Sequence, residues 1–418
     1  MATDRCIWVG RFQLADGRDI RGAAMAADQT QFRTSIIEAL IRRFQVLDRV
    51  IEASPLGPAI ASDQAAEALA LQVLRSGAPA IEHADNPPTA LVADRLLGLE
   101  PLDAQFGVYP LRTVPEQLED WLYPNDQATL FAVIDGSKVE GLPDLLSSLG
   151  LTHRSLFAGD AVEEYGSSGP WLVALERDSI LTRRLFTKLP DDGIGFGLWD
   201  AAPAIFIRTL MTPDALRHHL RRFLRVPLEN GSWSMFRFYD PVVFEAYLSG
   251  IADWPIRLRH WFMTADGERI ERVIAITGAG QASFFDFDET ALPPEVTEEP
   301  RPAFRLTDRD RIPLRALVRR NNIQSMARDL KSLLPEVFDG RSQQDVDQSV
   351  HLTVARLQPY GITHCADLLL FAGWDGLFGH DFEHRDGTGY LASILRSNQD
   401  GRRKAALVKA ALKGGVIG

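Results

Sequence analysis

Cysteine and long apolar runs are both scarce in this chain of 418 residues. Its two cysteines, Cys6 and Cys365, could form at most one disulfide, which is too sparse a framework to indicate an oxidising compartment. No apolar stretch approaches the roughly 20 residues that a membrane-spanning helix needs. The apolar run at 6–9 is flanked by arginines and is too short for a secretory signal. These absences favour a cytoplasmic protein.

Positive charge is in deficit. The chain has 45 Lys and Arg against 56 Asp and Glu, which gives a formal charge of -11. An acidic surface argues against general binding of nucleic acid or of an anionic membrane. The content of 45% hydrophobic and 24% charged residues is that of a folded soluble protein and excludes disorder of the whole chain.

Signatures of catalysis and cofactor binding are also missing. The sequence contains no GxSxG nucleophile elbow. Gly278 and Gly280 follow an apolar strand, but the third glycine of a phosphate-binding loop is absent and the acidic stretch FFDFDE comes next, so we expect a hairpin turn there. We therefore expect no catalytic residue, no cofactor and no small-molecule substrate.

Alternating strand and helix patterns predict a mixed α/β protein of several parts. Residues 1–120 read as a small α/β domain followed by a proline-rich connector, and residues 121–285 as a central α/β domain. Residues 286–300, DFDETALPPEVTEEP, have the composition of a solvated linker, and 301–418 have helical periodicity throughout.

The N-terminal domain has four expected elements before its connector. CIWVGRFQL and RDIRGAAMA predict a hairpin, and VLDRVIEA predicts a third strand. A helix is expected to begin after Thr30, between the hairpin and that strand, and a second helix is expected from about Asp63 to Arg75.

Arginines recur in the segment LRHHLRRFLRV, for which Thr212 and Pro213 provide a strong helix start. Helical spacing places Arg217, Arg221 and Arg225 on one face, with Arg222 beside them. Such a face could bind an acidic partner, and it could equally be a solvated face with local salt bridges.

The segment RFYDP is expected to end an aromatic strand, because Pro241 cannot continue a strand ladder. Alternation puts Arg237 and Tyr239 on the same face, and Arg237 is close enough in sequence to bond Asp240. The segment is either a structural corner or a hydrogen-bonding surface for a partner.

Two further groups lie near the C-terminus. Trp374 and Phe378, close to glycines, are either core residues or partner contacts. His380, Asp381 and His384 are the best candidates for a metal site, because positions i and i+4 share a helix face, and they would support a metal-dependent hydrolase as the alternative function. Glycines bracket the group and make an uninterrupted helix doubtful. The basic tail RRKAALVKAALK is interpreted as an amphipathic helix. A nucleic-acid site would be expected to have aromatic residues between the basic ones, and the tail has none.

Five short segments occur in order within about 110 residues of the middle third. In chain order they have the pattern of a strand ending in Asp-Gly, an aromatic turn, a Gly-Pro-Trp-Leu strand, a His-Leu-Arg helix and an Arg-Phe-Tyr-Asp-Pro end. They are LFAVIDGS (130–137), SLFAGD (155–160), SSGPWLVAL (167–175), LRHHLRRFLRV (216–226) and MFRFYDP (235–241). Together they resemble the effector adaptor/chaperone family of bacterial type VI secretion systems, the Tap or Tec type. The resemblance implies a non-enzymatic bacterial cytosolic protein that binds a toxic effector and loads it onto the VgrG spike. The first 120 residues resemble no family.

Overall fold

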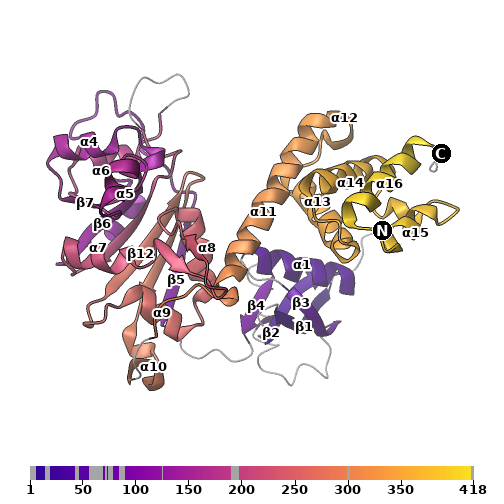
Figure 1. Cartoon of the computed structure of the whole chain (residues 1–418), viewed down its shortest axis with the longest axis horizontal. Coiled ribbons are helices and arrows are strands. Elements are labelled where there is room, and N and C mark those ends of the chain that lie inside the picture. Colours follow the sequence, from indigo (N-terminus) through magenta and orange to yellow (C-terminus); the bar gives the residue numbers. More distant parts are fainter. Residues whose placement is uncertain are drawn as a thin grey trace. The chain divides into compact units, whose positions relative to one another are not determined.

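The chain forms two compact units in the computed structural model, Met1–Ala316 and Leu317–Gly418 (Figure 1). The structure describes residues 6–14, 19–42, 47–55, 69–70, 73, 79–83, 90–124, 126–189, 197–298 and 302–415. None of the helices within these ranges is long and apolar enough to cross a membrane.

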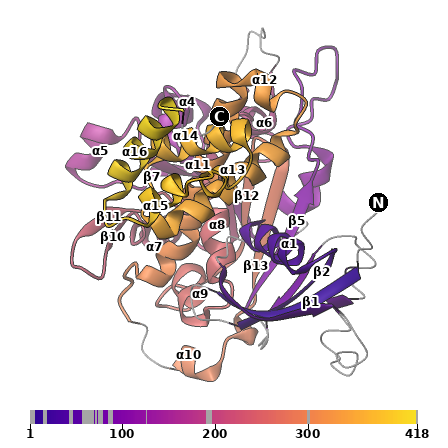
Figure 2. The same ribbon diagram turned by 90° about the vertical axis from the view of Figure 1, so that its right-hand side faces the viewer.

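A small four-stranded antiparallel sheet begins the first unit, in the order β3-β1-β2-β4. Its strands are β1 (Cys6–Leu14), β2 (Asp19–Ala26), β3 (Leu47–Pro55) and β4 (Ala80–His83). Helix α1 (Gln29–Arg42) lies along one face, where its Phe32, Ile36 and Leu40 are buried with Phe12 and Ile20 of the sheet (Figure 2). The expected hairpin, first helix and third strand are confirmed.

The first helix is capped by a different residue from the one expected. The backbone N–H of Gln31, in the first turn of the helix, donates to Asp28 Oδ1 at 2.8 Å. Asp28, rather than Thr30, is therefore the N-cap residue. Most of the helix expected at 63–75 lies outside the described residues.

The larger sheet of the first unit has seven strands, in the order β5-β13-β12-β9-β6-β8-β7, and every neighbouring pair is antiparallel. The strands are β5 (Leu91–Leu97), β6 (Thr129–Asp135), β7 (His153–Ser155), β8 (Pro170–Ala174), β9 (Ala204–Thr209), β12 (Ile270–Thr277) and β13 (Gln281–Phe287). The turn expected between 278 and 280 is confirmed, and Gly280 takes a φ of +72° that favours glycine.

Both faces of this sheet are buried, which explains why its central strands are apolar without alternation. On β6, Phe131 and Val133 belong to one core and Leu130, Ala132 and Ile134 to the other. The first core is covered by α7 (Pro213–Arg221), α8 (Pro241–Ile251) and α9 (Pro255–Phe262), and the second by α4 (Leu142–Leu149) and α6 (Ile180–Phe186). Shorter elements are α3 (Glu119–Leu122), α5 (Asp160–Tyr165), β10 (Arg225–Pro227), β11 (Trp233–Met235) and α10 (Pro294–Glu298).

The boundaries between the parts of the chain differ from the expected ones at the connector before residue 120 and at the linker 286–300. Strand β5 lies in the expected connector, yet it pairs with β13 in the large sheet. Within the expected linker at 286–300, Phe287 ends β13 and Leu292 is buried in the core of the first unit. The boundary between compact units falls after Ala316, inside the long helix α11 (Asp308–Leu333).

The described part of the second unit is helical, as expected. Besides the rest of α11 it contains α12 (Pro335–Phe338), α13 (Gln343–Leu357), α14 (Cys365–Phe378), α15 (Tyr390–Arg396) and α16 (Gly401–Lys413). The basic tail forms α16, which buries Ala405 and Val408 and is amphipathic as expected.

Candidate partner-binding surface

A buried carboxylate joins the first and last of the five motif segments. Asp135, at the end of β6, is 1% exposed. Its Oδ1 accepts bonds from the backbone N–H and the hydroxyl of Ser137, at 3.0 and 2.6 Å, and its Oδ2 accepts from Nη2 of Arg237 at 2.6 Å. Asp135 was not singled out from the sequence, although an Asp-Gly pair directly after a buried strand marks the position.

The expected strand through RFYDP is wrong, and so is its Arg237–Asp240 bond. Strand β11 ends at Met235, and Asp240 caps α8 by accepting from the backbone N–H groups of Val242 and Val243, at 3.0 and 3.3 Å. An Asp before a Pro is a helix-start signal, and here it prevails over the β propensity of the aromatics. Asp240 also pairs with Lys138 Nζ at 3.1 Å.

Two glycines allow the motif segments to approach this closely. A Cβ atom on Gly136 would lie 2.6 Å from the carbonyl oxygen of Gly169 and 2.7 Å from that of Ser167, and the Gly136 N–H donates to Gly169 at 3.0 Å. A Cβ atom on Gly169 would lie 2.5 Å from the ring of Phe157. The first and third segments are therefore in backbone contact, and the third packs against the Phe157 ring of the second.

The Gly136→Ala substitution is expected to lower the free energy of unfolding by about 1–3 kcal/mol, because the new methyl group would meet backbone atoms that cannot rotate away. Urea unfolding of the full chain measures the change. Gly387→Ala is the control, since a Cβ atom there meets nothing within 4 Å. Equal effects of the two substitutions would contradict the close packing at Gly136.

Arg217 ties the helix segment to the same group. Its Nε donates to the carbonyl of Ser155 at 2.7 Å and its Nη2 to that of Phe157 at 3.0 Å. Partial burial, followed by the charge of Arg221, lowers the pKa of Arg217 from its usual value. The side chain holds the aromatic turn in place rather than pointing freely into solvent.

The single arginine face expected on 216–226 does not form. Helix α7 ends at Arg221, and Arg222 follows as its C-cap, where it donates to the carbonyl and ring of His219. The pairing of Arg225 with Met235 places Arg225 in β10, and its guanidinium carbon lies 5.0 Å from the centroid of the Trp233 ring. Strand pairing therefore removes Arg225 from the helix.

Arg237, the partner of Asp135, is a charged group that faces solvent. Its side chain is 53% exposed, and its guanidinium carbon lies 5.8 Å from the centroid of the buried Tyr239 ring. The bond to Asp135 raises the pKa of Arg237, and burial, followed by the charge of Asp135, raises the pKa of Tyr239. At neutral pH Arg237 is thus a cation oriented by Asp135 beside the buried, uncharged Tyr239, and its remaining N–H groups can donate to an acceptor.

Comparison with known proteins finds one family model. Residues 130–256 match the family described as Domain of unknown function (DUF4123). The match spans all five motif segments and every residue of the surface described above. Neither a curated protein nor a solved structure matches the chain.

The two aromatic candidates outside the DUF4123 match have different environments. Trp374 is partly buried in the core of the second unit, with its ring centroid 5.0 Å from that of Phe371. Phe378, at the end of α14, is 39% exposed. Its ring centroid lies 6.0 Å from that of the buried Phe382, so Phe378 is partly exposed while still in contact with the core.

The histidine group at 380–384 does not take the helical form that its spacing required. Gly379 ends α14 with a φ of +88°, Asp381 has a φ of +60°, and 382–384 form a 3-10 turn. His380 lies 3.5 Å from Asp375 and 3.6 Å from Asp381, while His384 is exposed. No group of three or more His, Cys, Asp or Glu side chains in the described ranges is arranged to hold a metal ion.

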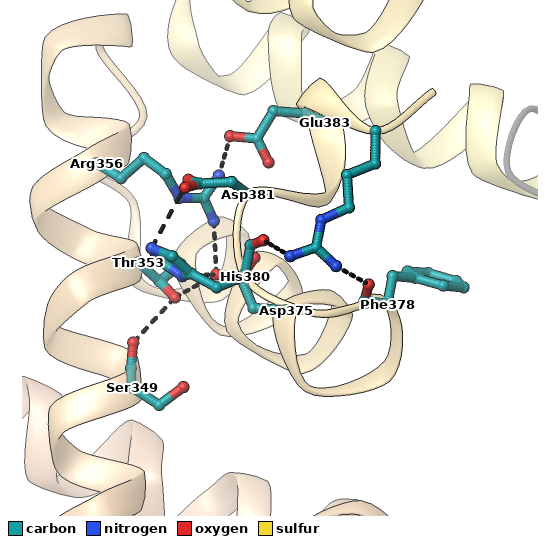
Figure 3. A network of polar contacts seen from close by, with 9 residues as sticks. Ser349, Thr353, Arg356, Asp375, Phe378, His380, Asp381 and Glu383 are labelled. Atoms are coloured by element: carbon teal, nitrogen blue, oxygen red, sulfur yellow. Dashed lines mark hydrogen bonds and ion pairs between the residues drawn. The ribbon is translucent and has the colours of Figure 1, made fainter. Parts of the chain in front are cut away.

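An arginine supplies the positive charge at this place (Figure 3). Arg356, on α13, points into the group formed by Asp375, Asp381 and Glu383 and pairs with all three. Its Nη2 lies 2.5 Å from Asp375, and its Nε lies 3.0 Å from Asp381. The guanidinium lies among the three carboxylates and offsets part of their negative charge.

Proposed function

We propose that the chain is a non-enzymatic cytosolic adaptor that binds a type VI secretion effector and loads it onto the VgrG spike. One observation carries the proposal: among the five segments that resemble the adaptor/chaperone family, the buried Asp135 of the first holds the half-exposed Arg237 of the last. The stretch that matches DUF4123 is the same stretch.

The geometry of the surface supports recognition of a protein partner. Because Asp135 is buried and holds one edge of the guanidinium, Arg237 loses little freedom when it binds a second acceptor. A planar guanidinium suits a carboxylate or a pair of backbone carbonyls. We therefore assign the contact with the effector or with VgrG to the neighbourhood of Arg237, while the other partner binds elsewhere on the chain.

The substitution Arg237→Lys is expected to weaken binding of one of these two partners about tenfold, a loss of about 1.4 kcal/mol. Lysine keeps the charge beside Asp135, so the fold is retained, but it loses the planar fork. Titration calorimetry of the full chain with the purified effector and with VgrG measures the change.

Arg269→Lys provides the matched control. Arg269 is 47% exposed and pairs with Glu289 at 2.9 Å, so it resembles Arg237 in exposure and in having a carboxylate partner, although Glu289 is partly exposed. It lies outside the motif segments. We expect its replacement to leave both affinities unchanged. Unchanged binding by Arg237→Lys, or equal losses of affinity in the two variants, would contradict the assignment of a partner contact to Arg237.

A further inference from the structure

A loop outside the motif segments carries the two most exposed aromatic side chains in the described part of the chain. Phe106 is 92% exposed and Tyr109 is 96% exposed, whereas other large apolar side chains of the described residues reach at most 66%. Val108 and Leu111 of the same loop are about half-exposed. We call residues 105–112 the aromatic loop.

The aromatic loop is held closed by one side chain. Gln105 donates from Nε2 to the carbonyl of Arg112 and accepts from the Arg112 N–H with Oε1, both at 2.8 Å. Gln105 itself has a φ of +51°, a left-handed conformation that costs a side chain free energy unless the surroundings impose it. The apolar tip is thus fixed in shape before any partner arrives.

Both ends of the loop are anchored to the first unit. The Leu102 N–H donates to the carbonyl of Phe186 at 2.9 Å, and Arg183 donates to the carbonyl of Ala104 at 2.9 Å. Beyond the loop, Val114 is buried in the core. A stable base with four exposed apolar side chains has the form of a binding element rather than of a poorly packed connection.

Charge around the tip decides the kind of partner. Residues 104–111 contain no charged side chain, and Arg112 at the base is paired with Glu116 at 2.8 Å. The tip therefore carries no free cation that would attract nucleic acid or an anionic membrane, and the whole chain has a formal charge of -11. An uncharged convex tip with a phenol hydroxyl fits a concave apolar pocket on a folded protein that has a hydrogen-bond acceptor.

We infer that the aromatic loop is a second partner-binding element, which inserts Phe106 and Tyr109 into an apolar pocket of a protein partner. The loop lies outside residues 130–256, the part of the sequence that matches DUF4123 and carries Arg237. The identity of that partner, the effector or VgrG, rests on the proposed function, whereas the insertion itself does not.

Site-specific photo-crosslinking in the host cell tests the inference with the full chain. A benzophenone amino acid replaces Tyr109, or replaces Leu210 as a control of 65% exposure outside the loop. We expect one protein adduct from position 109, identified by mass spectrometry as the effector or VgrG, and none from position 210. Equal adducts from both positions, an adduct with lipid or with a second copy of this chain, or no adduct from position 109 would each overturn the inference.

Purified components give the energetic test. The double substitution Phe106→Ser and Tyr109→Ser is expected to lower affinity for the crosslinked protein at least tenfold without lowering the melting temperature, because both side chains are almost fully exposed. Gln105→Ala, which opens the loop but keeps both rings, is expected to lower affinity by a smaller factor. Unchanged affinity in the double variant would overturn the inference.

The two proposals fail separately. If position 109 crosslinks another identified protein, and that purified protein binds the wild-type chain but not the double variant, the loop inference holds and the adaptor function is wrong. If the effector and VgrG bind the wild-type chain and the double variant equally, the adaptor function holds and the loop inference is wrong.

Discussion

Replacing Arg356 by alanine is expected to lower the unfolding free energy of the C-terminal unit by about 3–5 kcal/mol. The substitution leaves Asp375, whose side chain is 1% exposed, and Glu383, which is fully buried, without their shared cation. An uncompensated buried charge is far more costly than a lost surface pair. Urea unfolding followed by circular dichroism, which reports on these helices, measures the change.

Two variants show whether charge is the cause. Arg385→Ala is the control, since Arg385 is exposed and donates to the carbonyls of Phe378 and His380, at 3.3 and 2.8 Å, and we expect it to cost about 1 kcal/mol or less. Adding Glu383→Gln to the Arg356→Ala chain is expected to recover part of the loss. A loss below about 1 kcal/mol for Arg356→Ala would contradict the role of this cluster.

The same cluster predicts a dependence on pH. Burial acts to raise the pKa of Asp375, but hydrogen bonds from His380 and Thr353 and the charge of Arg356 outweigh it, so the pKa is lowered overall. A lowered pKa means that this stabilisation is complete above the unfolded-state pKa of about 3.9 and is lost as the pH falls through the folded-state value. The loss of stability below about pH 4 is expected to be smaller in Arg356→Ala than in the wild-type chain.

Asp310→Ala is expected to lower the unfolding free energy of the first unit by a similar amount, about 3–5 kcal/mol. Asp310 is fully buried and accepts from Arg257 Nη2 and from the Tyr247 hydroxyl, both at 2.7 Å. Its removal leaves the buried guanidinium of Arg257 without a carboxylate, with the Arg305 carbonyl as its remaining acceptor, and takes the acceptor from Tyr247. Tryptophan fluorescence during urea unfolding reports the change, because Trp261 donates to the Tyr247 hydroxyl at 3.0 Å.

Asp308→Ala is the matched control on the same helix. The Asp308 side chain is 69% exposed and pairs with Arg311 and Arg315 at 3.5 and 3.0 Å, so solvent screens these pairs. We expect it to cost less than about 1 kcal/mol. If Asp310→Ala cost no more than this control, the buried network would not be what fixes the start of α11 to the first unit.

Short sequence patterns predicted correctly the elements that are stabilised by residues close to one another in the sequence. Thr212 and Pro213 begin α7 because the cap hydroxyl accepts from the Ala215 N–H, an interaction within four residues. The hairpin at 278–280 follows from two strands and glycines next to it. These features depend on neighbours in sequence, so a sequence pattern is enough to find them.

The candidate surface depends on partners that are distant in sequence. Asp135 and Arg237 are 102 residues apart, and so are Lys138 and Asp240. No spacing rule pairs such residues, so Arg237 was assigned to the nearest carboxylate, that of Asp240. The Asp240-Pro241 cap was readable from the sequence, but the aromatic run before it favoured a strand.

The most direct test of the adaptor proposal is the mass of the particle formed when the full chain is co-expressed with its effector and VgrG, measured by light scattering after size exclusion. We expect one species whose mass accounts for all three proteins, and no effector bound to VgrG when the chain is omitted. A chain that elutes alone, or an effector that binds VgrG equally well without it, would contradict the proposal.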